Sequence, residues 1–268
     1  MKWIAAAVVL LIAGQAVAAT PQRIMSLKVC TDELLLDLVP ASRIASITFL
    51  SREKASLRLW PQAATIAVNH GTAEEILAVH PDLILTDPFL APGLRPLLAK
   101  SGAKVVEVPP AENFDQIRAV TRQVAKAVGE EARGQMLVAQ MDKELATLKA
   151  HRPTRVLTVA GWGGGGYVPG SGGLFDAILK AAGARNVERS SLGYYDVESL
   201  IAAHPDVLVY SDAYSGTASL RADQDLHPAL LKGYAGRRIS YAALYGCGVP
   251  QSVMAAKQIQ DELRKVRK

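Results

Sequence analysis

The sequence predicts an α/β protein of two doubly wound lobes with mainly parallel sheets, joined by a long rigid connecting helix. Three observations support this fold class. Strand-like and helix-like runs alternate in both halves of the chain. A unit occurs twice, since Glu74–Leu85 reads EEILAVHPDLIL and Glu198–Val209, 124 residues further along (198 − 74), reads ESLIAAHPDVLV. Between the two halves, residues 113–150 form one long helical pattern.

The first residues have the pattern of a secretory signal peptide over 1–19. Met1-Lys2 gives a positive start, Ile4–Ala13 is apolar, and Ala16–Ala19 offers small residues for cleavage. The apolar run is shorter than the about 20 residues that span a bilayer. No cysteine lies near the cleavage site, so we expect no lipid anchor. The mature protein is therefore expected to be soluble and periplasmic.

The remaining chain is long enough to divide into two lobes. We expect an N-terminal lobe over 20–110, the connecting helix over 111–152 and a C-terminal lobe over 153–268. The net charge is +5, and the basic residues are scattered without interleaved aromatic residues. This pattern predicts no nucleic-acid partner, and we expect a monomer.

The first lobe alternates regularly between the two kinds of element. We expect strands over 23–27, 43–48, 82–87 and 104–109, and helices over 31–38, from 72 and over 94–100. Thr31 or Asp32 is the expected cap of the first helix. Such alternation is typical of a parallel sheet with helices on its faces.

After the helical stretch, in which Gly129 is expected to mark a joint, the alternation resumes. We expect strands over 155–161 and 237–242, helices over 174–183 and from 250, and the second copy of the repeat between them. His80 and His204 lie in the repeated turns, where proline ends the helix, so we expect them to be structural.

Ligands of open parallel sheets bind beyond the carboxyl ends of the strands. Residues that follow the expected strands, or lie in nearby loops, are therefore the candidates for ligand binding. These are Lys28, Cys30, Phe49, His70 and Phe89 in the first lobe, and Trp162, Tyr167, Tyr194, Tyr214, Tyr245 and Cys247 in the second. All eight tyrosines lie at or beyond position 167, and such amphipathic rings suit a broad, partly apolar ligand.

The glycine-rich segment Gly161–Gly173 does not match a phosphate-binding loop. It lacks the Gly-Lys-Ser/Thr ending, and no acidic residue follows at the place that a dinucleotide site needs. Two interpretations remain open: close approach to a bulky ligand, or a flexible turn.

The two cysteines, Cys30 and Cys247, lie in different lobes and in expected cleft loops. A disulfide, two unlinked thiols, and ligation of a metal together with His70 are all compatible with the sequence. A bridge between the lobes would be expected to lock the cleft shut. No Ser-His-Asp order, His-Glu-x-x-His motif or nucleophile elbow is present, so we expect no catalysis.

The chain resembles the periplasmic substrate-binding proteins of ABC importers for cobalamin and ferric siderophores. Four segments carry the resemblance: RIMSLKVCTDELLLDL over 23–38, AEEILAVHPDLIL over 73–85, GGLFDAILKAAGARNV over 172–187 and ESLIAAHPDVLV over 198–209. The family has two α/β lobes joined by a rigid helical connector.

The resemblance implies a receptor for a bulky metal chelate, a corrinoid such as cobalamin or a ferric siderophore, with no cofactor of its own. Its partner would be an ABC permease with its ATPase. In cobalamin-binding members a glutamate of each lobe docks onto permease arginines, which implies this role for Glu74 and Glu198. Cys30 departs from the family, in which a small polar residue is common. The alternatives are a transition-metal-ion receptor using Cys30, His70 and Cys247, and a thiol-dependent periplasmic enzyme.

Overall fold

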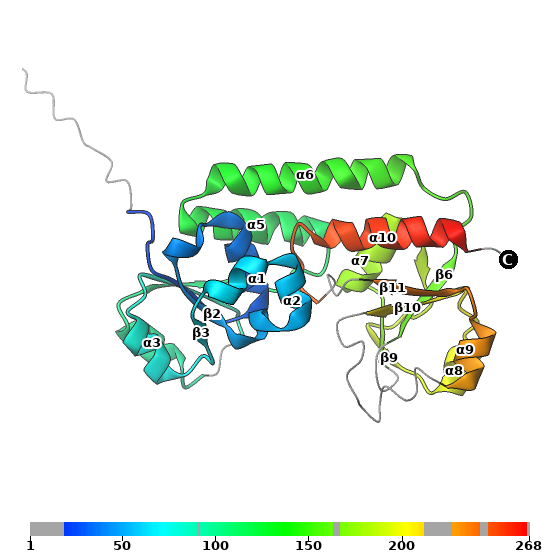
Figure 1. Cartoon of the computed structure of the whole chain (residues 1–268), viewed down its shortest axis with the longest axis horizontal. Helices are drawn as coiled ribbons and strands as arrows, with labels where there is room; N and C mark the ends of the chain where they lie inside the picture. Colours follow the sequence, from blue (N-terminus) through cyan, green and yellow to red (C-terminus); the bar gives the residue numbers. More distant parts are fainter. Residues whose placement is uncertain (1–18, 90–91, 163–166, 212–226, 242–245, 267–268) are drawn as a thin grey trace, which may run out of the picture.

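The computed structural model describes residues 19–89, 92–162, 167–211, 227–241 and 246–266. Two lobes lie side by side beneath a layer of long helices (Figure 1). Each lobe has its own sheet, and almost all strand pairs are parallel. The predicted fold class is confirmed, whereas the predicted signal peptide over 1–19 falls almost entirely outside the described residues.

The first lobe is built on a five-stranded parallel sheet with the order β3-β2-β1-β4-β5. Its strands are β1 (Ile24–Ser26), β2 (Ile44–Thr48), β3 (Val68–Asn69), β4 (Leu83–Thr86) and β5 (Lys104–Glu107). β1 and β4 are fully buried at the centre, as their continuous apolar runs predict. The loops after the carboxyl ends of these strands face the second lobe, and they carry the candidate residues of the first lobe.

Helices and short 3₁₀ turns surround this sheet. The helices are α1 (Val29–Leu38), α2 (Lys54–Leu59), α3 (Ala73–Val79) and α4 (Arg95–Lys100), and the turns are η1 (Ala41–Arg43), η2 (Phe49–Arg52) and η3 (Pro61–Thr65). The segment from η2 to η3 replaces a regular crossover helix between β2 and β3. The sequence has no strong helical periodicity that would predict this segment.

The expected cap of α1 is wrong. The helix begins two residues earlier than predicted, with Lys28 as its N-cap residue and no side-chain cap. Asp32 is instead buried, and its carboxylate accepts hydrogen bonds from the Thr48 backbone N–H (2.9 Å) and the Ser51 hydroxyl (2.6 Å). Asp32, in the first turn of α1, therefore forms hydrogen bonds with the neighbouring η2 turn and does not cap its own helix.

The long helical stretch is two helices, α5 (Phe114–Val128) and α6 (Glu131–Ala150). They meet at Gly129, which adopts a left-handed conformation with φ of 73°, so the predicted joint is confirmed. α6 runs above both lobes, whereas α5 lies beneath its first half (Figure 1). The rigid connection between the lobes is therefore α6, with α5 packed against it.

The second lobe has a four-stranded parallel sheet of order β11-β10-β6-β8 and an antiparallel pair, β7-β9. Its elements are β6 (Thr158–Trp162), β7 (Tyr167–Pro169), α7 (Leu174–Ala182), β8 (Arg185–Asn186), β9 (Leu192–Tyr194), α8 (Val197–Ala202), β10 (Val207–Ser211), α9 (Pro228–Gly233), β11 (Arg238–Tyr241) and α10 (Ser252–Lys265). α10 packs against α7 and α6, and so completes the helical layer.

The repeated unit has the same construction in both lobes. His80 and His204 are the non-glycine residues with positive φ in the described chain, at 46° and 47°, which confirms their structural role at the helix ends. The following aspartates anchor the first strand of each lobe. Asp82 accepts from the Gln22 backbone N–H (2.6 Å), and Asp206 accepts from that of Thr158 (2.8 Å).

Candidate ligand-binding cleft between the lobes

A cavity of about 700 Å³ lies between the two lobes. Its wall comes from the loops after β1, β2, β3, β4 and β5, from β7, and from the start of α7. Apolar side chains dominate the lining: Leu27, Val29, Leu34, Phe49, Leu50, Val108, Pro109, Pro110, Ala111, Val120, Tyr167, Pro169, Leu174 and Phe175. The volume and composition are those of a small-molecule site.

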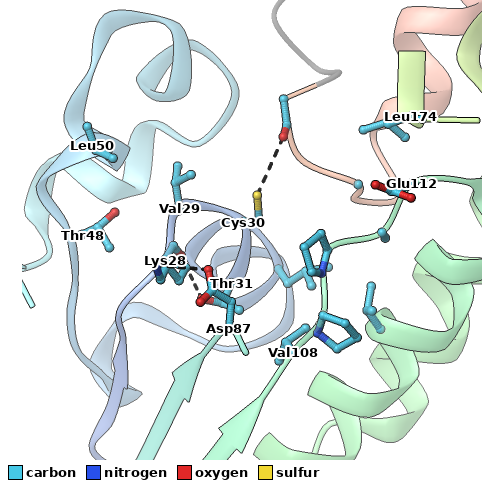
Figure 2. A pocket seen from close by; sticks show the side chains of 18 of the residues that line it. Lys28, Val29, Cys30, Thr31, Thr48, Leu50, Asp87, Val108, Glu112 and Leu174 are labelled. Carbon is cyan, nitrogen blue, oxygen red and sulfur yellow. Dashed lines mark hydrogen bonds and ion pairs between the residues drawn. The ribbon is translucent and has the colours of Figure 1, made fainter. Parts of the chain in front are cut away.

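Five of the predicted ligand-binding residues line this cavity, namely Lys28, Cys30, Phe49, His70 and Tyr167. Four of them come from the first lobe and follow strands or begin helices, as expected for the carboxyl edge of a parallel sheet. Tyr167 comes from the second lobe. The cavity is therefore formed by both lobes, and Figure 2 shows first-lobe residues and Leu174 of the second lobe around it.

His70 is held on the wall by two contacts. Its Nδ1 lies 3.0 Å from Glu75 Oε1, and its ring stacks on Phe49 with the centroids 5.0 Å apart. Glu75 also accepts from the His70 and Thr72 backbone N–H groups, and these hydrogen bonds, led by the one from the imidazole, hold the pKa of Glu75 at about 2. Because Nδ1 contacts the carboxylate, the other ring nitrogen, Nε2, is the one available to a ligand.

Lys28 and Asp87 form an ion pair on the wall of the first lobe, with Nζ and Oδ2 3.1 Å apart (Figure 2). Beneath this pair, Thr31 closes the start of α1 by donating to the Lys28 carbonyl (2.8 Å). Glu112 also reaches the wall, from the segment between β5 and α5. The cleft thus combines a largely apolar surface with a few separate polar groups.

Cys30 and Cys247 form a disulfide, with their Cα atoms 5.1 Å apart. This overturns the interpretations as unlinked thiols and as metal ligands with His70, because neither sulfur remains as a thiolate. The expectation that a bridge would lock the cleft shut is also wrong. Cys30 and the neighbours of Cys247, Gly246 and Gly248, all line the cavity, so the bridge lies in its wall and leaves the space open. Figure 2 marks the contact of 3.9 Å between Cys30 Sγ and the Gly246 carbonyl.

Other predicted ligand-binding residues lie off this wall. Trp162 is 3% exposed and packs in the apolar core of the second lobe, because it is the last residue of β6 and faces inward. Phe89 is 75% exposed and Tyr194 is 73% exposed. Tyr194 pairs with Tyr167 across β7 and β9, with ring centroids 6.2 Å apart. Tyr214 and Tyr245 fall outside the described residues.

The glycine-rich segment makes close approaches to the protein's own chain. A Cβ atom on Gly161 would lie 2.7 Å from the Phe175 ring, and one on Gly170 would lie 2.0 Å from the Ser190 carbonyl oxygen. Gly170 and Gly173 also line the cavity. The interpretation of this segment as a simple flexible turn is wrong for residues 167–169, which form β7; residues 163–166 fall outside the described chain.

Part of the cavity wall lies outside the predicted ligand-binding residues. Residues 108–112 follow β5 and line the cavity, but they are not among the predicted ligand-binding residues. Asp87, directly after β4, also lines the cavity and is also outside that predicted set. The same carboxyl-edge argument would have found all of these positions.

The two glutamates of the repeat are exposed in the first turns of α3 and α8. Figure 1 shows these helices at the outer parts of different lobes, both on the side away from α6. In the described part of the chain every helix is too short or too polar to cross a bilayer.

The chain belongs to the periplasmic binding protein family, whose pattern matches residues 26–227. Members of this family are solute-binding proteins that work in ABC-type transport and are not enzymes, so the expectations of family and of no catalysis are confirmed. A comparison with curated proteins found no match.

Solved structures with the same fold include three with known cargo. A periplasmic haem-binding protein of Vibrio cholerae is 21% identical, with a TM-score of 0.75 and coverage of 90% of this chain and 98% of that one. The periplasmic vitamin B12-binding protein of the same organism is 17% identical, with a TM-score of 0.69 and coverage of 91% and 97%. A structure of an ABC-type Fe3+-hydroxamate transport system from Saccharomonospora viridis is 19% identical, with a TM-score of 0.68 and coverage of 91% and 93%.

Proposed function

We propose that this protein captures a bulky metal chelate, a corrinoid such as cobalamin or a ferric siderophore, and delivers it to an ABC permease in the cytoplasmic membrane. The observation that carries the proposal is the cavity of about 700 Å³ between the lobes, with its apolar lining and separate polar groups. A cavity of this size suits a large organic ligand, because small solutes need tighter enclosure and more hydrogen-bonding groups.

The relatives with known cargo support a chelate rather than a bare ion. Haem, vitamin B12 and ferric hydroxamate are chemically different, but each carries its metal inside an organic ligand. In the described chain no group of three or more His, Cys, Asp or Glu residues could hold a metal ion. A metal that enters this cleft would therefore bring most of its ligands with it.

His70 favours a chelate with one open coordination position. Because Glu75 holds Nδ1 and Phe49 supports the ring, Nε2 is free to act as a nitrogen donor. A corrin or porphyrin offers an axial position to such a donor, whereas a hexadentate siderophore fills all positions of its iron. The pair of His70 and Glu75 thus supports a macrocyclic chelate more than a saturated siderophore complex.

The test is a fluorescence titration of the mature, disulfide-bonded protein. Trp60 and Trp162 are buried in different lobes and report binding of a coloured chelate through quenching. The panel contains cobalamin, cobinamide, haem, ferric hydroxamates, ferric catecholates and free Fe3+, Co2+ and Zn2+. We expect saturable quenching by one class of chelate and none by the free ions. Saturable binding of a free ion with silence from every chelate would refute the proposal.

A second readout tests the role of His70. If Nε2 binds the metal of a macrocycle, the wild-type complex has a visible spectrum of an imidazole-ligated metal, and His70→Ala loses it. Glu75→Gln keeps the ring but weakens its orientation, and we expect an affinity between those of the wild type and His70→Ala. An unchanged spectrum in His70→Ala would remove this residue from metal binding and leave the cleft assignment intact.

A further inference from the structure

The described wall of the cleft carries one ammonium group, that of Lys28, and two carboxylates, those of Asp87 and Glu112. Lys28 and Asp87 neutralise each other at 3.1 Å. Glu112 forms no ion pair with any residue that the structure describes, and it faces the same cavity. Figure 2 shows Glu112 on the opposite side of Cys30 from the Lys28–Asp87 pair, so the lysine does not compensate it. Among the residues that the structure describes, the wall therefore carries one carboxylate that no ion pair neutralises.

The backbone that carries Glu112 is fixed. Its N–H donates to Gln116 Oε1 at 2.6 Å, and Asn113 caps α5 immediately afterwards. The preceding residue, Ala111, is 7% exposed and lies against the disulfide loop, since a Cβ atom on Gly248 would come within 2.2 Å of the Ala111 carbonyl oxygen. Glu112 is thus presented to the cleft from a rigid segment, although its side chain remains accessible.

The apolar surroundings strengthen the effect of this charge. Val108, Pro110 and Leu174 line the same cavity. A charge near low-dielectric walls acts on a ligand more strongly than the same charge in open water. His70 does not offset the negative charge of Glu112, because its imidazole lies beside another carboxylate, that of Glu75.

We propose that Glu112 is a specificity-determining residue that makes the cleft favour neutral and cationic metal chelates over anionic ones. This inference rests on the proposed function and names the charge class of the same ligand. An anionic chelate would bring its charge toward an unpaired carboxylate, whereas an ammonium group or a cationic metal centre would be attracted by it. Among the candidate cargoes, this favours corrinoids and ammonium-bearing hydroxamates over catecholates and carboxylate-rich siderophores.

The experiment uses two ligand series in which only charge changes. The first is cyanocobalamin with one corrin side chain ending in a carboxylate, an amide or an aminoethyl amide. The second is ferrioxamine with its terminal ammonium free, acetylated or succinylated. Affinities are measured at low and high salt for the wild-type protein, Glu112→Gln and Glu112→Lys. Glu131→Gln is the matched control, because it removes one exposed carboxylate, at the first residue of α6, that does not line the cavity.

In the series that binds, we expect the wild type to favour the ammonium form over the carboxylate form by about tenfold at low salt, a preference that salt reduces. Glu112→Gln should bring this ratio close to one, and Glu112→Lys should reverse it. Glu131→Gln should keep the wild-type ratio. Binding of a series with a ratio that Glu112→Gln leaves unchanged would overturn the inference alone. Absence of binding by both series and by the wider panel of chelates would overturn the proposed function together with it.

Discussion

Asp32 shows how a single buried carboxylate joins the first helix of the protein to the loop beside the cleft. Its Oδ2 accepts from the Thr48 backbone and hydroxyl and from the Ser51 hydroxyl. Burial raises the pKa of Asp32 to about 6, although these hydrogen bonds act in the opposite direction. Burial and the charge of Asp32 in turn raise the pKa of Glu33 to about 8.

The Asp32 carboxyl should therefore make stability depend on pH. Its pKa in the folded state lies above its value in the unfolded chain, so its contribution is most favourable at low pH and is lost as pH rises toward 6. Between pH 4 and pH 7 this carboxyl should lower the free energy of unfolding of the wild type by up to about 3 kcal/mol. We expect Asp32→Asn to lack this decrease. The measurement is the free energy of unfolding in urea at both pH values. An equal pH dependence in the wild type and the variant would contradict this account of Asp32.

At the residue scale, the positions that follow expected strands predicted part of the cleft wall. Lys28 and Phe49 follow parallel strands, whose carboxyl ends meet at one edge. Trp162 shows the limit of the rule. Its strand runs one residue further than the sequence indicates, and the alternation of side chains then turns the indole into the lobe's own core.

The two copies of the repeated helix end allow a matched test at the scale of an element. His80 and His204 have left-handed backbone conformations, which cost an ordinary side chain about 1 kcal/mol relative to glycine. We expect His80→Gly and His204→Gly each to raise the free energy of unfolding by about 0.5–1 kcal/mol. His151 also follows a helix and is exposed, but its φ is −109°. His151→Gly should therefore give no gain; a gain there equal to the other two would refute the conformational explanation.

The elements that the sequence predicted well have strong local signals. Apolar runs predicted β1, β4 and β10, and Gly129 predicted the joint at which α5 ends. The elements that it missed depend on distant contacts. β7 and β9 are three residues each, and they pair antiparallel from two separate segments, with Tyr167 opposite Tyr194. No local period in the sequence specifies such a pairing.

At the scale of the whole molecule, the disulfide joins α1 of the first lobe to the loop that leads into α10. Gln251, at the start of α10, also donates to the Asp37 carboxylate of α1. The disulfide and this hydrogen bond therefore both connect α1 with the segment that begins α10. Neither cysteine alone predicts the bridge, because the distance between the two lobes is a property of the complete fold.

We expect the double variant Cys30→Ser/Cys247→Ser to lower the free energy of unfolding by about 2–4 kcal/mol. The physical reason is that the bridge closes a loop of 217 residues in the unfolded chain. Urea unfolding of the variant, the oxidised wild type and the reduced wild type measures this. The reduced wild type should match the variant. A variant as stable as the oxidised protein would show that the bridge does not stabilise the fold.

The permease-docking proposal also concerns the whole molecule, because it requires one acidic residue on each lobe. We expect Glu74→Lys and Glu198→Lys each to weaken binding to permease-containing membranes, and the double variant to abolish it. Ligand affinity should remain unchanged, since neither residue lines the cavity that the structure describes. Glu131→Lys is the control for net charge. Loss of ligand binding with intact docking would contradict the assignment.

Filling the space between the lobes tests whether that space holds the chelate. Gly173 lines the cavity with an ordinary backbone conformation, and a Cβ atom there would meet no atom within 4 Å. Gly233, at the end of α9, is equally open but lies outside the cavity lining. The measurement is an equilibrium titration of the cargo identified by the panel against the wild type, Gly173→Phe and Gly233→Phe. We expect Gly173→Phe to weaken binding at least about tenfold, equivalent to about 1.4 kcal/mol, and Gly233→Phe to bind like the wild type. Equal affinity of all three proteins would place the ligand elsewhere and contradict the account.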